Sequence, residues 1–189
     1  TGQIDPNNLS EEDQLNYRLL KSDYEISLEG REYPGYYMRL NQRGGVQDYY
    51  LYGNRLNFTD LQSYKNWFER VKGYTQNVRN SLEINKEGLE LGYTQPKLVT
   101  RGVSAQIGAM LERDLEDHPY FKIFKNVGDV ASPEDALALQ NEVKEYIQNV
   151  LNPAYQELYD FLINEYLPES RDTIGCLLYT SPSPRDSIA

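Results

Sequence analysis

The segment NVLNPAYQELYDFLINEYLPESRDTIG, from Asn149 to Gly175, decides the fold class. Apolar and aromatic residues recur in it every three or four positions, which is the spacing of one helix face. The face consists of Tyr155, Leu158, Tyr159, Leu162 and Tyr166, flanked by further apolar residues at Leu151, Phe161, Ile163 and Leu167. Pro153 suits a first helical turn, and Pro168 is expected to stop the helix at Leu167. The segment therefore predicts a helix buried on more than one side.

The rest of the chain repeats this helical pattern, with start and stop signals around each apolar stripe. The sequence predicts four helices. The first begins at Ser10 and ends at Gly30, and the second begins at a Thr59–Gln62 capping box and ends at Gly92. The third runs from Pro96 to Leu111, and the fourth begins at Ser132 and continues through Val150. Gly73 is a possible break in the second helix, and Gly102 and Gly108 allow close helix approach in the third. The spacing leaves open whether the last helix restarts or only kinks at Pro153.

Two connections are less regular. Residues 31–58 contain Pro34 and four glycines (Gly35, Gly44, Gly45 and Gly53), together with a set of tyrosines: Tyr33, Tyr36, Tyr37, Tyr49, Tyr50 and Tyr52. We expect an ordered loop with a short helical turn there, because long structureless connections are rare in compact domains. Residues 114–131 form a charged and aromatic link with Pro119 and Gly128 as breakers. No segment alternates like a strand, so the predicted fold is all-α, a multi-helix bundle-like subdomain with one long ordered loop.

The composition limits the partners. The chain has 189 residues, Lys+Arg 19 against Asp+Glu 29, a formal net charge of -10 and a pI of about 4.7. That charge repels nucleic acid, and no run of basic residues offsets it, so no nucleic-acid partner is expected. No apolar run reaches the roughly 20 residues that cross a bilayer, so no transmembrane segment is expected. The single Cys176 excludes an internal disulfide.

The last residues, 176–189, differ in character from the rest. The segment CLLYTSPSPRD, from Cys176 to Asp186, matches at every residue the translation of a transposase sequencing adapter. We therefore predict that 176–189 is an artefactual, unstructured tail and that the protein proper is 1–175. The alternative is a flexible Ser/Pro-rich linker.

Three segments carry a family resemblance: LNQRGG (Leu40–Gly45), VLNPAYQEL (Val150–Leu158) and FLINEYLPESRDTIG (Phe161–Gly175). On these, residues 1–175 resemble the N-terminal part of the bacterial family called domain of unknown function 885. The resemblance implies a helical, zincin-like metallopeptidase, a hydrolase acting on peptides, in which His and Glu residues far downstream hold zinc. It also implies an exported, envelope or lipoprotein-like location. In this interpretation the chain is an N-terminal fragment whose partner is the missing C-terminal part of its own chain.

Candidate site residues are few. His118 is the single histidine, and we expect it to pack at the surface or in a loop, because a zinc site needs several converging ligands. Gly44–Gly45 lacks the P-loop pattern, which leaves a tight turn or a loop that presents Asn41, Gln42 and Arg43 to a substrate cleft. The carboxylate pairs Glu11/Glu12, Glu83/Glu87 and Asp114/Asp117 are expected on solvated faces. No catalytic, metal or cofactor residue is predicted within the chain.

Two functions remain open. The first is the helical fragment of a zinc-dependent peptidase that forms a cleft wall or lid and is inactive by itself. The second is a non-catalytic helical binding module in which the tyrosine-rich loop holds a partner or glycan. The tyrosines also fit a cover over the helical core, which is the better expectation. A regulatory subdomain without activity is a third, weaker reading of the same residues.

Overall fold

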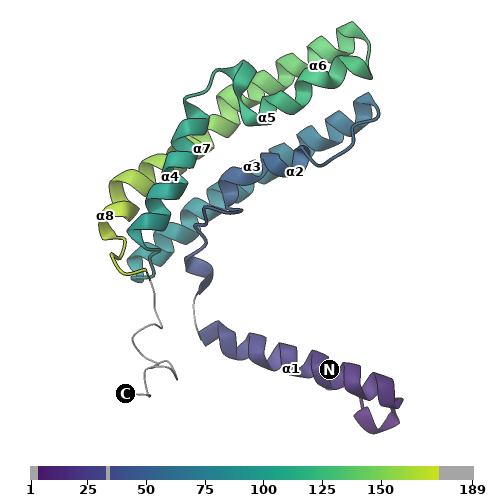
Figure 1. Cartoon of the computed structure of the whole chain (residues 1–189), viewed down its shortest axis with the longest axis vertical. Coiled ribbons are helices and arrows are strands. Elements are labelled where there is room, and N and C mark those ends of the chain that lie inside the picture. The colour runs from purple at the N-terminus through teal and green to yellow at the C-terminus, as the bar shows by residue number, and fades with distance from the viewer. Residues whose placement is uncertain (1–3, 33–34, 175–189) are drawn as a thin grey trace, which may run out of the picture. The chain divides into compact units, whose positions relative to one another are not determined.

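The computed structural model describes residues 4–32 and 35–174, and all regular structure in them is helical (Figure 1). The chain divides into two compact units, residues 1–36 and 37–189. An isolated parallel bridge joins Pro96 and Arg171, and the described residues contain no β-strand. The all-α prediction is therefore confirmed. The predicted tail, 176–189, lies outside the described residues.

The first unit consists mainly of helix α1 (Glu11–Glu29), between the 3-10 turns η1 (Pro6–Asn8) and η2 (Gly30–Glu32). Ser10 caps α1, since its side chain accepts a hydrogen bond from Asp13 N at 3.2 Å. The helix ends at Glu29 with Gly30 as its C-cap, in agreement with the predicted end, but Gly30 is not left-handed. Its φ of -59° is right-handed, and the chain continues directly into η2. None of the α1 side chains is buried.

The short turn η3 (Gly35–Tyr37) spans the boundary between the units. The second unit then contains the short η4 (Val46–Asp48) and α2 (Tyr50–Gly53), followed by the long α3 (Leu61–Glu90) and α4 (Lys97–Leu111). Three short elements, η5 (Leu115–Asp117), α5 (Pro119–Lys122) and η6 (Ile123–Asp129), lead to a final helical rod. The rod runs from α6 (Pro133–Tyr146) through η7 (Ile147–Leu151), α7 (Asn152–Phe161) and η8 (Leu162–Tyr166) to α8 (Leu167–Glu169). Figure 1 shows α6, α7 and α8 following one another along a single curved path.

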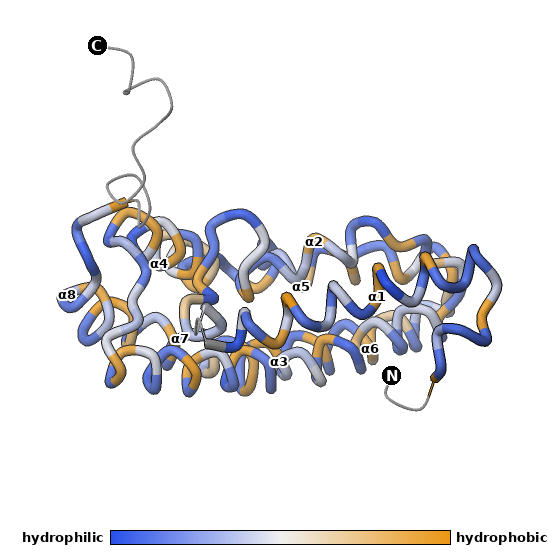
Figure 2. The backbone as a smooth tube through the Cα atoms, turned by 90° about the horizontal axis from the view of Figure 1, so that it is seen from below, coloured by the Kyte–Doolittle hydropathy of each residue, from blue (hydrophilic) through white to orange (hydrophobic). Residues whose placement is uncertain are grey.

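The core lies where the rod packs against α3 and α4. Figure 2 shows apolar and polar residues alternating along these helices, as expected for amphipathic helices that share one core. In α3 the buried positions recur every three or four residues: Tyr64, Trp67, Phe68, Val71, Thr75, Val78, Ser81, Leu82, Asn85 and Gly88. In the rod, four of the five predicted stripe residues are fully buried, namely Tyr155, Leu158, Leu162 and Tyr166, and the fifth, Tyr159, is half-buried. None of the described helices is both long enough and apolar enough to span a membrane.

Two prolines lie inside the rod, and each follows a π-helical segment. In η7 the N–H of Asn152 bonds to Ile147 O, and in η8 the N–H of Leu167 bonds to Leu162 O. These wider turns accommodate the rings of Pro153 and Pro168, which have no N–H to donate and would clash with a regular α-helical turn. The helix therefore neither restarts at Pro153 nor stops at Leu167. It ends at Glu169, followed by Ser170 in an extended conformation.

The start of α3 differs by one residue from the predicted cap. The N-cap is Asp60, whose Oδ1 accepts from Ser63 N at 2.7 Å, and Ser63 Oγ receives a bond from Asp60 N in return. Thr59 and Gln62 therefore do not form the capping box. Gly92, with φ 79°, follows the C-cap residue Leu91 and ends the helix as predicted.

Helix α3 also runs unbroken through Gly73, and this predicts a stabilising substitution. A Cβ at Gly73 would meet no atom within 4 Å, so Gly73→Ala adds helix propensity without a clash. We expect the free energy of unfolding to rise by about 0.5–1 kcal/mol, measured by urea denaturation. Gly88→Ala is the matched control in the same helix. Its Cβ would lie 2.9 Å from Tyr37 Cβ, so it should destabilise; a stabilising Gly88→Ala would contradict this packing.

Candidate functional site

The LNQRGG loop, Leu40–Gly45, is held against α4 by the side chain of Gln42. Gln42 Nε2 donates to Leu98 O at 3.1 Å, and Gln106 Nε2 donates to Gln42 O at 3.0 Å. Gly102 makes room for this contact, because a Cβ there would lie 2.8 Å from Gln42 Cγ. Gly102 therefore allows a close approach, as predicted, but to this loop rather than to another helix.

The loop then turns sharply at Gly44. Asn41 Oδ1 accepts from Arg43 N at 2.9 Å, which is the geometry of an Asx turn. Gly44 has a φ of 118°, a region that residues with a side chain rarely adopt, and its N–H donates to Asp48 Oδ2 at 2.9 Å. The tight-turn interpretation of Gly44–Gly45 thus agrees with the structure, and the Gly44 N–H is already paired.

Buried groups attach the far end of the loop to the core. Gln47 is buried, and its Nε2 donates to Asn41 O and to Gln106 Oε1, both at 2.8 Å. Tyr155 Oη lies 2.7 Å from Val46 O and 2.8 Å from Tyr120 Oη. A carbonyl only accepts, so Tyr155 donates to Val46 and Tyr120 donates to Tyr155. The loop is consequently tied both to α4 and to the rod.

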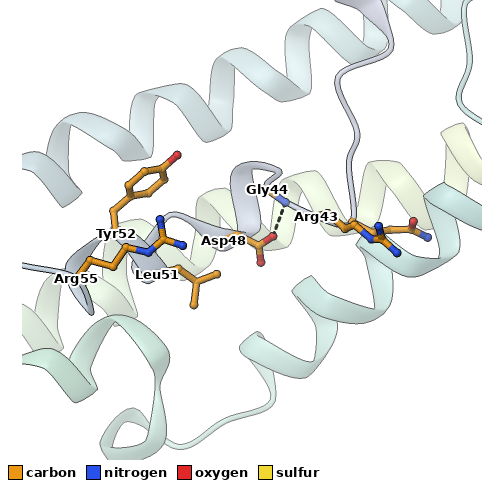
Figure 3. A pocket seen from close by; sticks show the side chains of 7 residues that line it. Arg43, Gly44, Asp48, Leu51, Tyr52 and Arg55 are labelled. Carbon is orange, nitrogen blue, oxygen red and sulfur yellow. Dashed lines mark hydrogen bonds between the residues drawn. The ribbon is translucent and has the colours of Figure 1, made fainter.

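A pocket of about 460 Å³ lies beside this loop (Figure 3). Its lining comes from the loop, η4 and the α2 region: Gln42, Arg43, Gly44, Asp48, Leu51, Tyr52 and Arg55. In Figure 3 the Arg55 side chain extends toward Asp48, and Arg43 lies on the other side of Asp48. None of the ion pairs among the described residues includes an arginine. The pocket therefore contains two guanidinium groups and one carboxylate.

The structure separates the three predicted site residues by role. Asn41 and Gln42 use their side chains to hold the loop, through the bonds to Arg43 N and Leu98 O. Arg43 is exposed, and its side chain makes no hydrogen bond or ion pair with the described residues. Arg43 is thus the member of the trio that is available to a ligand.

The sequence-based prediction missed Arg55 and Asp48, and it named Tyr52 only as one of the tyrosines of the loop. Arg55 follows α2, and this short helix brings it to the same pocket as Arg43. A search for neighbouring basic residues in the sequence does not find such a pair. The one sequence feature that indicated these residues is that Asp48 and Arg55 flank the tyrosines of the short helix α2.

A second pocket, of about 480 Å³, lies against the same loop and shares Gly44 with the first. Arg39 lines it together with polar residues of α3, including Asn77 and Asn80. Arg39 also has no ion-pair partner among the described residues. Both hollows beside the loop therefore carry an arginine.

The tyrosine-rich segment divides into cover and exposed residues. Tyr37 is buried, and its Oη donates to Glu87 Oε1 at 2.7 Å. Tyr49 stacks on Tyr74 with ring centroids 3.6 Å apart and packs on Trp67 at 5.4 Å. Burial, with the neighbouring Tyr49, Tyr52 and Asp48, raises the pKa of Tyr74 to about 12. Tyr52, by contrast, is 61% exposed at the pocket. Tyr33 lies outside the described residues.

His118 is fully buried between η5 and α5, so it is a packed residue and not a surface one. Its pKa is lowered to about 4, chiefly by burial; the adjacent Asn152 side chain partly opposes this effect, and the Arg113 charge adds to it. Neither ring nitrogen, nor Asn152 Oδ1, has a hydrogen bond of regular geometry. The imidazole is therefore neutral at physiological pH and packed on Tyr120, 5.9 Å between ring centroids.

The zinc that the resemblance implies does not fit the described residues. Within 4–32 and 35–174, no group of three or more His, Cys, Asp or Glu side chains lies close enough to hold a metal ion. A zinc site requires three or four such ligands. The carboxylate pairs Glu11/Glu12, Glu83/Glu87 and Asp114/Asp117 are all exposed, in agreement with the solvated faces predicted for them.

Comparison with known proteins gives one match. The sequence model of a family described as a bacterial protein of unknown function (DUF885) matches residues 1–186. No curated protein and no solved structure matches the chain. The family match extends into the segment Cys176–Asp186, so the boundary at Gly175 and the adapter origin of the tail stay predictions. Because the match covers nearly the whole sequence, the chain belongs to the DUF885 family of bacterial proteins.

Proposed function

We propose that this chain is a helical, substrate-binding part of a zinc-dependent peptidase, in which it forms one wall or lid of the cleft. The zinc ligands of that enzyme would come from residues other than those described, since the described ones form no metal site. The family resemblance supports the peptidase class, and the pocket beside the LNQRGG loop supports the binding role.

The observation that carries the binding role is the contrast between the rigid loop and the unpaired Arg43. Gln42 and Gln47 donate hydrogen bonds to backbone carbonyls, and Asp48 accepts one from Gly44 N, so the loop is fixed in place. Preorganised backbone around an unpaired polar group is typical of binding sites, because little conformational entropy is lost when the ligand binds. The mixed lining, with Leu51 and Tyr52 beside the charged groups, suits a peptide, which presents both apolar and polar atoms.

The test uses the protein expressed from its complete reading frame. We expect about one zinc per chain by elemental analysis and cleavage of a mixed peptide library by mass spectrometry, both lost after chelation. A zinc-free protein that cleaves no peptide but binds one would support the non-catalytic binding module instead. The presence or absence of a His-Glu metal signature downstream gives an independent check.

A further inference from the structure

We infer that the pocket between Arg43 and Arg55 recognises a carboxylate of a peptide. The inference deepens the proposed function, because it takes the ligand to be a peptide and names the group by which the pocket selects it.

The charge of the pocket carries the argument. The chain as a whole is strongly acidic, with a formal net charge of -10. Against that background, Arg43 and Arg55 line one hollow and neither has an ion-pair partner among the described residues. Every ion pair in the described part of the chain uses a lysine instead. Arginine presents a planar fork of donors that matches a carboxylate bidentately, which lysine does not.

The internal carboxylate of the pocket is already engaged. Asp48 Oδ2 accepts from Gly44 N, and in Figure 3 Asp48 lies between the two arginines without pairing to either. A ligand carboxylate can therefore pair with a guanidinium without first displacing a protein carboxylate. The other Asp48 oxygen accepts no hydrogen bond from the described residues, which leaves it available to a peptide N–H.

The rest of the lining fits a peptide better than a small inorganic anion. The volume, about 460 Å³, is within the range of small-ligand sites, and Leu51 and Tyr52 supply apolar contact. Tyr52 contacts Tyr49, with ring centroids 5.5 Å apart, but is 61% exposed, so the exposed part of its ring can pack on a ligand side chain. The backbone N–H of Gly44, which would be needed for a phosphate cradle, is used by Asp48.

The experiment measures binding without requiring catalysis. Four N-acetylated tripeptides are titrated into the purified chain by calorimetry: Ala-Ala-Ala acid, its C-terminal amide, Ala-Glu-Ala amide and Ala-Gln-Ala amide. We expect at least one carboxylate peptide to bind about tenfold more tightly than its neutral counterpart, and less tightly at high salt. Preference for the acid over the amide identifies a C-terminal carboxylate, and preference for Glu over Gln identifies a side chain.

Substitutions assign the effect to the pocket. Arg43→Gln and Arg55→Gln should each lower the affinity for the carboxylate peptide about tenfold and leave the neutral peptide unchanged. Arg79→Gln, on an exposed position of α3 that does not line the pocket, is the matched control and should change neither. Both pocket arginines are exposed, so the variants should unfold at the wild-type urea concentration.

The outcomes separate this inference from the proposed function. Equal affinity for charged and neutral peptides, or equal affinity in wild type, Arg43→Gln and Arg55→Gln, overturns the carboxylate assignment even if the intact protein hydrolyses peptides. If the peptide binds in an arginine-dependent way but the intact protein hydrolyses no peptide, the carboxylate assignment stands and the peptidase proposal is wrong.

Discussion

Lowering the pH from about 7.5 to about 4.5 is expected to reduce the free energy of unfolding by about 2.5 kcal/mol through His118 alone. The imidazole is fully buried in the folded chain, and its pKa is lowered from 6.5 to about 4, chiefly by burial. In the unfolded chain it titrates at the ordinary value. Between these two pKa values the unfolded state binds the extra proton, so stability is complete above about pH 6.5 and falls as the pH approaches 4.

The measurement is urea denaturation of wild type and His118→Gln across this pH range. Carboxylates also titrate below about pH 5, but they are common to both proteins, so the difference between the two pH profiles isolates His118. Gln cannot be protonated, so the free energy of unfolding of His118→Gln should fall by about 2.5 kcal/mol less than that of wild type over this pH range. This difference does not depend on the stability of the variant at neutral pH. Parallel profiles would mean that His118 is solvated or paired in the folded chain.

The interpretation of His118 shows what the sequence does and does not contain. Its isolation from other ligand residues in the sequence is the reason that no metal site is predicted there. Its burial follows from tertiary contacts. The π segment η7 carries Asn152 to the start of α7, where its side chain lies beside the imidazole. The local sequence pattern predicts neither the π turn nor the contact of His118 with Asn152, which lies more than thirty residues later in the chain.

The helices, in contrast, were predictable because their signals are local. Ser132 accepts from Asp135 N at 3.1 Å and starts α6 as the sequence predicts, and Pro96 is the N-cap of α4. The prediction of Thr59 as the cap was wrong because Thr59 and Asp60 are adjacent and both residue types cap helices well. The backbone angles determine which of the two side chains reaches Ser63 N, and in the structure it is that of Asp60. Local propensity therefore locates a helix to within a residue or two.

The prediction that Pro168 stops the helix at Leu167 was wrong for a different physical reason. The rule that proline ends a helix assumes a regular α-helical turn before it. A continuous rod is favoured because it buries a whole apolar stripe, and one widened turn ahead of each proline permits it. The buried residues of this stripe are Leu151, Tyr155, Leu158, Leu162 and Tyr166. The packing energy of a buried stripe thus outweighs a local preference.

The candidate site was half predictable. The glycine pair and the polar residues before it pointed to the LNQRGG loop, and the loop does border two pockets. The pairing of Arg43 with Arg55 needed the path of the chain through η4 and α2. The anchoring of the loop by the rod likewise joins residues that are remote in sequence, Val46 and Tyr155.

That anchor gives the last prediction: Tyr155→Phe should destabilise the chain by about 2 kcal/mol. The substitution keeps the ring but removes the hydroxyl that donates to Val46 O and accepts from Tyr120. Two polar groups then lose their partner, one of them on a fully buried tyrosine. Tyr120→Phe is the matched control. It removes only the hydroxyl that donates to Tyr155 and leaves the Tyr155–Val46 hydrogen bond intact. It should therefore lower the free energy of unfolding less than Tyr155→Phe does, as measured by urea denaturation.

The same pair of variants connects the core to the pocket. Val46 follows Gly45 directly, so loss of its hydrogen bond loosens the loop that positions Arg43. Tyr155→Phe should therefore weaken the binding of the carboxylate tripeptide several-fold, since the loop must be ordered on binding, whereas Tyr120→Phe should not. The double variant should resemble Tyr155→Phe in binding, because the Tyr120 hydroxyl acts on the loop only through Tyr155. It should be less destabilised than Tyr155→Phe, because the buried Tyr120 hydroxyl that Tyr155→Phe leaves without a partner is then absent. Equal weakening by the two single variants would show that the buried tyrosines stabilise the core but do not hold the loop.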